Sequence, residues 1–394
     1  MPNPPRHILP TIVVAQFAGT SLWFAGNAVL PDLRRAHDLG DGLLGPLTIA
    51  VQLGFIVGTM LYAALRLVDR LPPSRVFLAS ALAAAACNAT MAGPADGPAS
   101  LWAARFGTGV FLAGVYPVGM AIAADWYRGG LGRALGWLVG ALVLGTAFPH
   151  ALRFLTGDLP WQAGVLGSSL LAVAGAIALA LFVPDGPYRR MAAGFRPGAV
   201  TSVFRHAPFR AAAFGYVGHM WELYAFWAFV PLLIATRFPD AESGTVSLAS
   251  FAVIGIGAVG CLAGGYAAER VGSGRVAVAL LATSGLACLA SPALGWLPAS
   301  GAVVLLAVWG FAVVGDSPQF STLVARTAPA EVRGSALTIV TSLGFLVTLP
   351  AIELLQRGAA SASGAAPAWL FLLLLPGPLA GLLALTGPRG ARSV

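Results

Sequence analysis

Lysine is absent from this sequence. None occurs in the 394 residues, so the 23 positions counted as lysine plus arginine are all arginine. A phosphate-binding loop of the form Gly-x-x-x-x-Gly-Lys-Ser/Thr uses its lysine to reach the nucleotide. The sequence therefore excludes a protein that is driven by ATP bound at such a loop.

Charge of either sign is scarce. Charged residues make up 10% of the chain and hydrophobic residues 58%, whereas a soluble domain is about 25% charged. The mean hydropathy is +0.82. The apolar residues fall in runs of about 18 to 25, which is the length that crosses the hydrocarbon of a bilayer. We predict an all-α polytopic membrane protein in a lipid bilayer.

Cysteine is also rare. The three cysteines all lie inside apolar runs, without the spacing of a metal site; they are Cys87, Cys261 and Cys288. We interpret them as small buried hydrophobic residues. We therefore expect no bound metal and no cofactor.

Twelve apolar spans are predicted, with a polar segment between the sixth and the seventh. The spans cover 8–30, 43–65, 75–93, 100–124, 133–155, 162–183, 210–234, 245–267, 275–293, 300–324, 334–356 and 367–386. We predict an N-terminal six-helix bundle over 1–183, a cytoplasmic linker over 184–209 and a C-terminal six-helix bundle over 210–394. The first run aligns with the seventh, so we expect a retained span and not a cleaved signal.

The arginines indicate the orientation of the spans. With the N-terminus inside, 17 arginines lie in inner segments, 5 in outer segments and one, Arg105, inside a span. Cytoplasmic loops carry the excess of positive charge. We predict that both termini are cytoplasmic, in a plasma membrane of the bacterial inner-membrane kind. The net charge of +8 then reflects topology, and we expect no binding to nucleic acid.

The chain repeats itself at about half its length. At an offset of 200, an acid and two arginines recur as Asp69/Glu269, Arg70/Arg270 and Arg75/Arg275, and Pro31 recurs as Pro231. At an offset of 201, Pro117 recurs as Pro318 and Pro149 as Pro350. An internal repeat of this kind indicates a duplicated structure.

These residues resemble the major facilitator superfamily. The resemblance rests on four motifs: Gly265-x-x-x-Glu269-Arg270-x-Gly272-x-x-Arg275, Asp69-Arg70 with Arg75, Arg105-Phe-Gly-Thr-Gly109, and Gly132-Arg133-Ala-Leu-Gly136. It implies two pseudo-symmetric six-helix bundles around a central substrate site, which repeat transporters place near the midplane.

The chain also departs from the family pattern. Leu65 and Pro72 stand where glycine is usual, and span 5 lacks the Gly-Pro-x-x-Gly-Gly run of drug antiporters. Spans 2 and 8 carry no arginine near mid-membrane, unlike those of nitrate porters. The resemblance therefore leaves the subfamily and the substrate open.

Three ionisable residues in the second half are the first functional candidates, because such groups are costly inside a membrane. His219 and Glu222 share a face of span 7. By the helical rise, His219 and Asp316 lie roughly 13 Å and 12 Å from the inner ends of their spans. Such a cluster can bind protons or substrate. The alternatives are acids that cap or pair helices, a packing histidine, or a metal site.

Arg105 and His150 are the candidates in the first half. They lie at similar depth in spans 4 and 5. The resemblance implies that Arg105 takes part in proton coupling. It could equally bind an anionic substrate, or bond helix carbonyls as a structural staple, and His150 could serve only in packing.

A cytoplasmic gate is predicted at the two loop motifs. Ion pairs there would hold the inner side closed and break on opening, and such pairs are weak, at about 0–1 kcal/mol. Asp125 is the expected partner of Arg70 or Arg75. The gate residues are Asp69, Arg70, Arg75, Asp125, Glu269, Arg270 and Arg275. The alternative is a solvated charge run that only sets topology.

The expected cavity lining is aromatic with a few amides: Gln16, Trp23, Asn27, Gln52, Tyr116, Trp221, Tyr224, Trp227 and Gln319. We predict a monomeric secondary transporter, proton-coupled, for a small organic ion or metabolite. The alternative is an efflux antiporter for drugs or for toxic or metal ions. A membrane-embedded enzyme or lipid-handling protein is disfavoured, because no serine, cysteine or threonine has an obvious nucleophile context.

Overall fold

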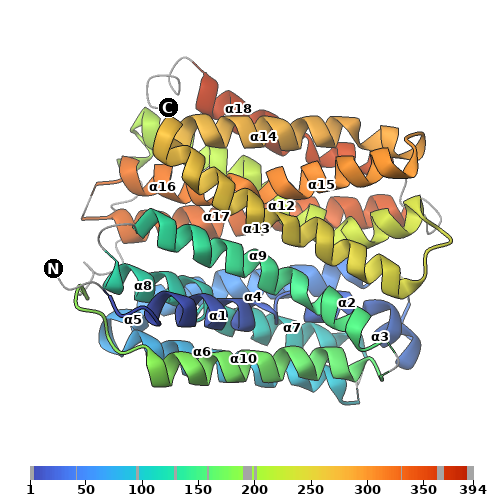
Figure 1. The fold of residues 1–394 in the computed structure, drawn as a ribbon, viewed down its shortest axis with the longest axis horizontal. Helices are drawn as coiled ribbons and strands as arrows, with labels where there is room; N and C mark the ends of the chain where they lie inside the picture. Colours follow the sequence, from blue (N-terminus) through green and yellow to red (C-terminus); the bar gives the residue numbers. More distant parts are fainter. Residues whose placement is uncertain are drawn as a thin grey trace. The chain divides into compact units, whose positions relative to one another are not determined.

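The structure, a computed structural model, describes residues 4–40, 42–94, 97–127, 131–157, 159–189, 198, 202–329, 331–361 and 368–387. These residues form helices and connecting turns without a strand (Figure 1). The chain divides into two compact units, Met1–Gly194 and Phe195–Val394. Residues 190–197 and 199–201 of the predicted linker lie outside the described residues, and α12 (Ala207–Arg237) begins inside its predicted range.

Unit 1 contains six helical spans, three of them divided into shorter helices. Its elements are α1 (Ile8–Thr20), α2 (Ala25–Ala28), α3 (Leu30–Ala36), α4 (Leu44–Leu65), α5 (Leu67–Arg70), α6 (Pro73–Ala89), η1 (Thr90–Ala92), α7 (Pro98–Leu112), α8 (Tyr116–Trp126), α9 (Leu131–Leu155) and α10 (Gln162–Phe182). Helices α6 and α10 run side by side (Figure 1).

Unit 2 also contains six spans. Its elements are α12, α13 (Ser243–Val271), α14 (Ser273–Ala290), η2 (Ser291–Gly295), α15 (Ala299–Gly315), α16 (Ser317–Thr327), α17 (Arg333–Ser361), η3 (Ala368–Leu374) and α18 (Pro376–Thr386). Helix α12 packs against α17 and α18, and α13 packs against α15.

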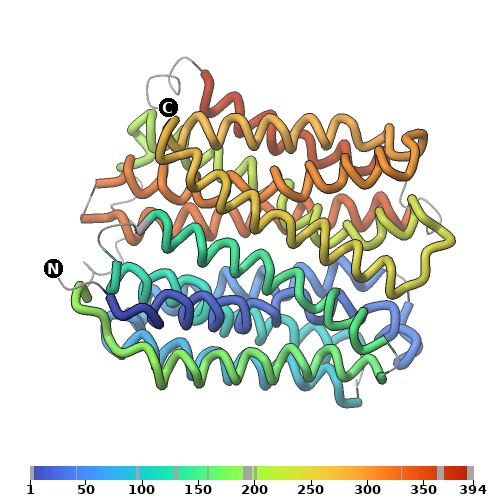
Figure 2. The backbone as a smooth tube through the Cα atoms, in the orientation of Figure 1, coloured from blue at the N-terminus to red at the C-terminus, as the bar shows by residue number. Residues whose placement is uncertain are grey.

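Eleven helical segments in the described residues are long and apolar enough to cross a membrane, and Ile8–Thr20 is a shorter apolar helix. The protein is therefore a multi-pass membrane protein. The first span is not the continuous helix that the sequence predicts over 8–30. Its backbone leaves the helix between Ser21 and Phe24, as the dark blue trace shows (Figure 2).

The repeated prolines explain where two other spans break. Span 4 breaks between α7 and α8, just before Pro117, and span 10 breaks at Asp316, just before Pro318. Proline has no N–H for a helix and restricts the residue before it, so a helix restarts readily with proline in its first turn. Pro149 and Pro350 lie instead inside the continuous helices α9 and α17.

Glycine lets two pairs of helices approach closely, one pair in each unit. A Cβ on Gly109 of α7 would overlap the carbonyl oxygen of Val51 in α4. A Cβ on Gly310 of α15 would overlap the carbonyl oxygen of Val253 in α13. Small residues allow such backbone contact between helices in lipid. The two units thus share a close glycine–carbonyl contact, with the glycines 201 residues apart and the valines 202 apart.

The loop motif adopts a different turn in each unit. In unit 2, α13 ends at Val271 and is followed by Gly272, whose φ of 91° suits glycine. Pro72 occupies the matching position in unit 1 and has a φ of −56°, because its ring fixes that angle. There α4 ends earlier, at Arg66, which adopts the left-handed conformation with φ 54°. The Arg66 Nε lies 3.2 Å from Asp69 Oδ2.

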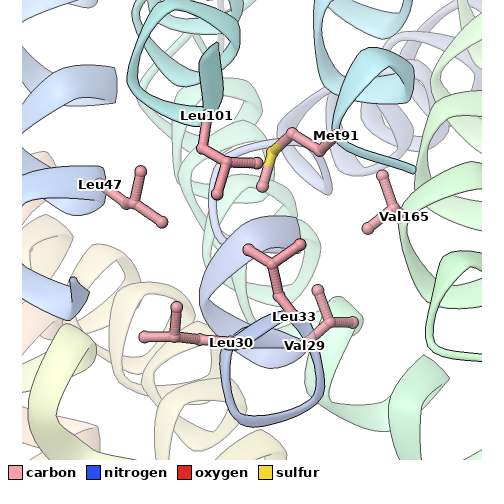
Figure 3. Packing of buried hydrophobic residues seen from close by; sticks show 7 residues of the cluster. All are labelled: Val29, Leu30, Leu33, Leu47, Met91, Leu101 and Val165. Atoms are coloured by element: carbon pink, nitrogen blue, oxygen red, sulfur yellow. The ribbon is translucent and has the colours of Figure 1, made fainter. Parts of the chain in front are cut away.

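An apolar cluster anchors the end of the broken first span. Leu33 of α3 lies among side chains from four other segments (Figure 3). The cluster comprises Val29, Leu30, Leu33, Leu47, Met91, Leu101 and Val165, each no more than 7% exposed. The burial of this cluster stabilises the position of α3. Because α3 is held there, the break in the first span must lie before it.

Candidate functional site

A buried histidine and a buried aspartate meet in the core of unit 2. The Nδ1 atom of His219 lies 2.9 Å from Oδ1 of Asp316. His219 is 1% exposed and Asp316 is 0% exposed. Helix α12 supplies the histidine, and the break between α15 and α16 supplies the aspartate. The two residues that the sequence places at one depth are thus in direct contact.

The surroundings of the His219–Asp316 pair include aromatic rings and few hydrogen-bonding groups. The ring of His219 lies 5.5 Å from that of Phe320 and 6.0 Å from that of Tyr216, measured between centroids. His219 Nε2 and both carboxylate oxygens of Asp316 have no hydrogen-bond partner of good geometry among the described residues, so the Nδ1–Oδ1 contact is close in distance only. Few surrounding groups can stabilise a charge on this pair. The net charge of the pair therefore has to be balanced by the protons that its two side chains carry.

Glu222, one turn further along α12, has a different environment. Its Oε1 accepts hydrogen bonds from Trp309 Nε1 at 2.6 Å and Cys288 Sγ at 3.2 Å. Its Oε2 accepts one from Ser284 Oγ at 2.9 Å. Glu222 is 1% exposed, and the three donor residues are each 0% exposed. Glu222 therefore has three side-chain donors, whereas Asp316 contacts one titratable partner.

Sequence reasoning missed the donors to Glu222. Cys288 is buried in the core, as predicted, and its thiol also donates to a carboxylate, which the sequence did not indicate. A signal was present, because Ser284 and Cys288 are four residues apart and so share one face of α14. Nothing in the sequence places Trp309 of α15 near that face, since packing of α12, α14 and α15 brings them together.

Arg105 of α7 binds the broken first span of unit 1. Its Nη1 donates to the carbonyl oxygen of Leu22 at 3.0 Å, and its Nη2 donates to that of Trp23. Arg105 is 0% exposed. The helix break frees these carbonyls, and a bilayer requires every such group to be satisfied within the protein. The geometry is that of a staple between spans 1 and 4.

The other candidates in unit 1 are buried and polar. His150 of α9 is 2% exposed, and its Nε2 has no hydrogen-bond partner among the described residues. Trp23 Nε1 donates to Gln52 Oε1 at 3.2 Å, and Asn27 Nδ2 donates to Thr48 Oγ1 at 2.8 Å. The indole in the break of the first span and the amide of α2 thus each donate to a polar side chain of α4.

Two further members of the expected lining of unit 1 differ in burial. Gln16 is fully buried, and neither atom of its amide has a hydrogen-bond partner among the described residues. Tyr116 is half-buried at the start of α8.

The expected lining residues of unit 2 divide between two places. The ring of Tyr224 lies 5.3 Å from Trp227 and 5.0 Å from Phe345, measured between centroids. Gln319, one turn after Asp316, is 3% exposed. Trp221 lies elsewhere: its indole donates to the carbonyl of Leu373. It lines an apolar groove of about 430 Å³ between α12, α17 and α18.

The gate residues lie at the ends of helices, as the motifs predict, without the expected partners. Asp125 forms no ion pair or hydrogen bond with Arg70 or Arg75 in the structure as described, although all three residues are resolved in it. Instead, the Asp125 carbonyl accepts from the backbone N–H of Tyr188 at 3.0 Å. The guanidinium of Arg189 donates to the carbonyl of Leu71 at 2.8 Å.

In unit 2, the gate candidates Glu269, Arg270 and Arg275 are exposed. They form no ion pair with one another within the described part of the chain.

Within the described residues, no group of three His, Cys, Asp or Glu side chains has an arrangement that could hold a metal ion. The chemistry that these groups can perform is reversible proton binding and the binding of charged or hydrogen-bonding solutes.

Comparisons with known proteins identify the family. The family model described as Major Facilitator Superfamily matches residues 12–351. The chain belongs to the major facilitator superfamily. This confirms the predicted family and, with it, a secondary transporter that is not an enzyme. Among curated protein sequences, no match is found.

A solved structure confirms the fold class of twelve membrane helices in two six-helix bundles. The chain is similar to the MFS proton:xylose symporter XylE bound to 6-bromo-6-deoxy-D-glucose, with a TM-score of 0.75. The identity is 12%, and the match covers 97% of this chain and 96% of that one. At this identity the likeness concerns the fold alone.

Proposed function

We propose that this transporter moves a small organic ion or metabolite by alternating access, and that proton binding at His219 and Asp316 drives the movement. The observation that carries the proposal is the buried contact of 2.9 Å between Nδ1 of His219 and Oδ1 of Asp316. Histidine changes charge near neutral pH more readily than any other side chain.

The chemistry of the pair links protons to substrate charge. When His219 is protonated and Asp316 is ionised, the two charges cancel. Loss of one proton leaves the pair with a net negative charge, and gain of one leaves a net positive charge. An uncompensated charge is costly in an apolar site, so a substrate charge of the opposite sign is favoured there. Exchange of protons for substrate charge is the expected coupling.

Several further features belong to the proposal. The two halves rock about a central site, and the inner helix ends carrying Asp69, Arg70, Arg75, Asp125, Glu269, Arg270 and Arg275 form the cytoplasmic gate. Arg105 holds the broken first span beside that site, and His150, Gln319, Tyr116, Tyr224, Asn27 and Trp23 contribute to its lining. Both termini are cytoplasmic, the membrane is the bacterial inner membrane, and the monomer is the working unit.

The test is transport by the purified full chain in liposomes. A pH-sensitive dye inside the vesicles reports proton movement while candidate anions, cations and zwitterions are added outside. Wild type is compared with Asp316→Asn, Glu222→Gln and, as a control, Glu353→Gln, which alters a membrane-helix acid that pairs with Arg357 at 2.7 Å. The direction of solute movement separates uptake from export.

The expected result is a solute that moves protons with wild type and with Glu353→Gln. Asp316→Asn should reduce this rate at least about a hundredfold, the scale on which a positioned proton-transfer group acts. Solute accumulation without proton movement, unchanged by Asp316→Asn, would overturn proton coupling at this pair. Arg105 would then become the next residue to test.

A further inference from the structure

We infer that Glu222 carries its proton on Oε2 and that Ser284 serves both protonation states by turning its hydroxyl between Glu222 and the carbonyl of Leu281. Ser284 is then a positioning residue. The inference rests on the proposed function, because one of its tests measures proton-coupled transport. It concerns Glu222, the second buried acid, which we take as a further proton-binding group one turn along α12 from His219.

The first observation is that Ser284 has two acceptors and one hydrogen. Its Oγ lies 2.9 Å from Glu222 Oε2 and 3.1 Å from the carbonyl oxygen of Leu281. A hydroxyl donates one hydrogen bond and can also accept. When Glu222 is ionised, Ser284 donates to Oε2. When Oε2 carries a proton, the carboxyl donates to Ser284, and Ser284 donates to Leu281.

The second observation is that Oε1 is reserved for donors. The indole N–H of Trp309 donates at 2.6 Å and cannot accept. The thiol of Cys288 donates at 3.2 Å and is at most a weak acceptor. A proton on Oε1 would point at these donors and displace them. The cage therefore directs the proton to Oε2, where it forms one O–H bond while no other covalent bond changes.

The third observation is that the hydrogen-bond partners of Glu222 are buried, so the oxygen that carries the proton determines which hydrogen bonds are kept. Ser284, Cys288 and Trp309 are each 0% exposed, so water does not replace a lost partner. Among the described residues, the other buried titratable groups of this core are His219, Tyr216 and Tyr224 on α12, Cys261 on α13, Cys288 on α14 and Asp316 between α15 and α16. Cys261 is occupied, since its thiol donates to the carbonyl of Val314 at 3.3 Å.

The thiol of Cys288 provides the test, because S–H stretching absorbs in an infrared window free of other protein bands. The full chain in liposomes is titrated with pH, and Cys288→Ala identifies the band. As Oε2 gains its proton, Oε1 loses negative charge, and the S–H band should move to higher wavenumber. Glu222→Gln should hold the band at that position at every pH. The same titration of Asp316→Asn shows whether any part of the S–H band shift arises from Asp316 and not from Glu222.

Variants of Ser284 test the switch itself. Ser284→Ala removes a hydrogen bond to a charged group, so proton-coupled transport should fall about tenfold, and the protonated-carboxyl band should shift. Ser284→Thr keeps the hydroxyl, so its transport rate and its protonated-carboxyl band should both match those of wild type. Thr283→Ala is the matched control, because that neighbouring hydroxyl donates to the carbonyl of Ala279 in its own helix. It should resemble wild type.

The outcomes separate this inference from the proposed function. A pH-invariant S–H band in wild type, or an indole band of Trp309 that reports a freed N–H on protonation, would overturn the assignment to Oε2. Wild-type transport and spectra in Ser284→Ala would overturn the role of Ser284. Either result can occur while Asp316→Asn still abolishes proton movement. Conversely, Asp316→Asn can prove silent while the Glu222 titration behaves as expected.

Discussion

The two halves of the molecule use buried charge in opposite ways. Among the described residues, unit 1 buries the cation Arg105, which main-chain carbonyls of a broken helix bind. In unit 2 the span that corresponds to this broken helix, α12, is continuous over 31 residues, and the described buried groups include the acids Glu222 and Asp316. Side chains bind those acids. Duplication thus preserved the helix framework, while the groups inside it diverged.

The difference teaches which interactions hold the fold and which are free to change state. Arginine remains charged at all physiological pH values, so the Arg105 contacts are permanent. In the proposed mechanism the carboxylate beside histidine gains and loses protons, so its contacts change during the transport cycle. We therefore expect Arg105 substitutions to affect stability, and acid substitutions to affect transport more than stability.

Removal of the Arg105 guanidinium should cause the largest loss of stability. Arg105→Ala leaves two carbonyls in the membrane interior without their donor, at an expected cost of about 3 kcal/mol, since hydrogen bonds to charged groups contribute about 1.5–3 kcal/mol each. Arg105→Lys keeps the charge but cannot bind two carbonyls in the same planar geometry, so it should recover part of the lost unfolding free energy. Denaturant unfolding in detergent measures both, and equal stability of Arg105→Ala and wild type would contradict the staple.

The glycine contacts test whether the two units are packed alike. Gly109→Ala and Gly310→Ala each force a methyl into the carbonyl of the neighbouring helix, and overpacking of this kind costs about 1–3 kcal/mol. Gly334→Ala in α17 is the control, because nothing lies within 4 Å of the added Cβ. Unfolding free energies should fall by similar amounts for the first two variants. A large difference between them would show that the packing has diverged as well.

The contact between His219 and Asp316 should appear as a coupling free energy. A double-mutant cycle with His219→Asn and Asp316→Asn is expected to give about 1.5 kcal/mol, within the range of about 0.5–3 kcal/mol for contacting residues. Unfolding free energies of wild type, the two single variants and the double variant measure it. A coupling near zero would contradict a direct interaction between the two side chains.

The smallest expected effect concerns two ion pairs, one near the end of α9 and one near the end of α17. Arg153 in α9 binds Asp32 at 2.8 Å, with side chains 16% and 15% exposed. Arg357 in α17 binds Glu353 at 2.7 Å, with side chains 77% and 38% exposed. Exposed pairs contribute about 0–1 kcal/mol, so Arg153→Gln should cost about 1 kcal/mol and Arg357→Gln nothing measurable. The same unfolding assay decides between them, and a reversed order would contradict this comparison.

Much of the fold was predictable because a bilayer imposes one length scale on every span. The positions of Pro117 and Pro318 also indicated matching features, although not that both spans break there. The break in the first span was missed. The run over 8–30 has no proline near the break to mark it, and the compensation for its broken hydrogen bonds comes from Arg105, about 80 residues away in the chain.

The sequence by itself determined the class of protein, the family and the short list of buried ionisable groups, since each charge in an apolar run must have a reason to be there. Only the tertiary structure decided their partners. It joined Arg105 to carbonyls, Asp316 to His219, and Glu222 to Ser284, Cys288 and Trp309. The physical reason is that hydrogen bonds and ion pairs act over about 3 Å, and the packing of helices distant in sequence determines which groups come that close.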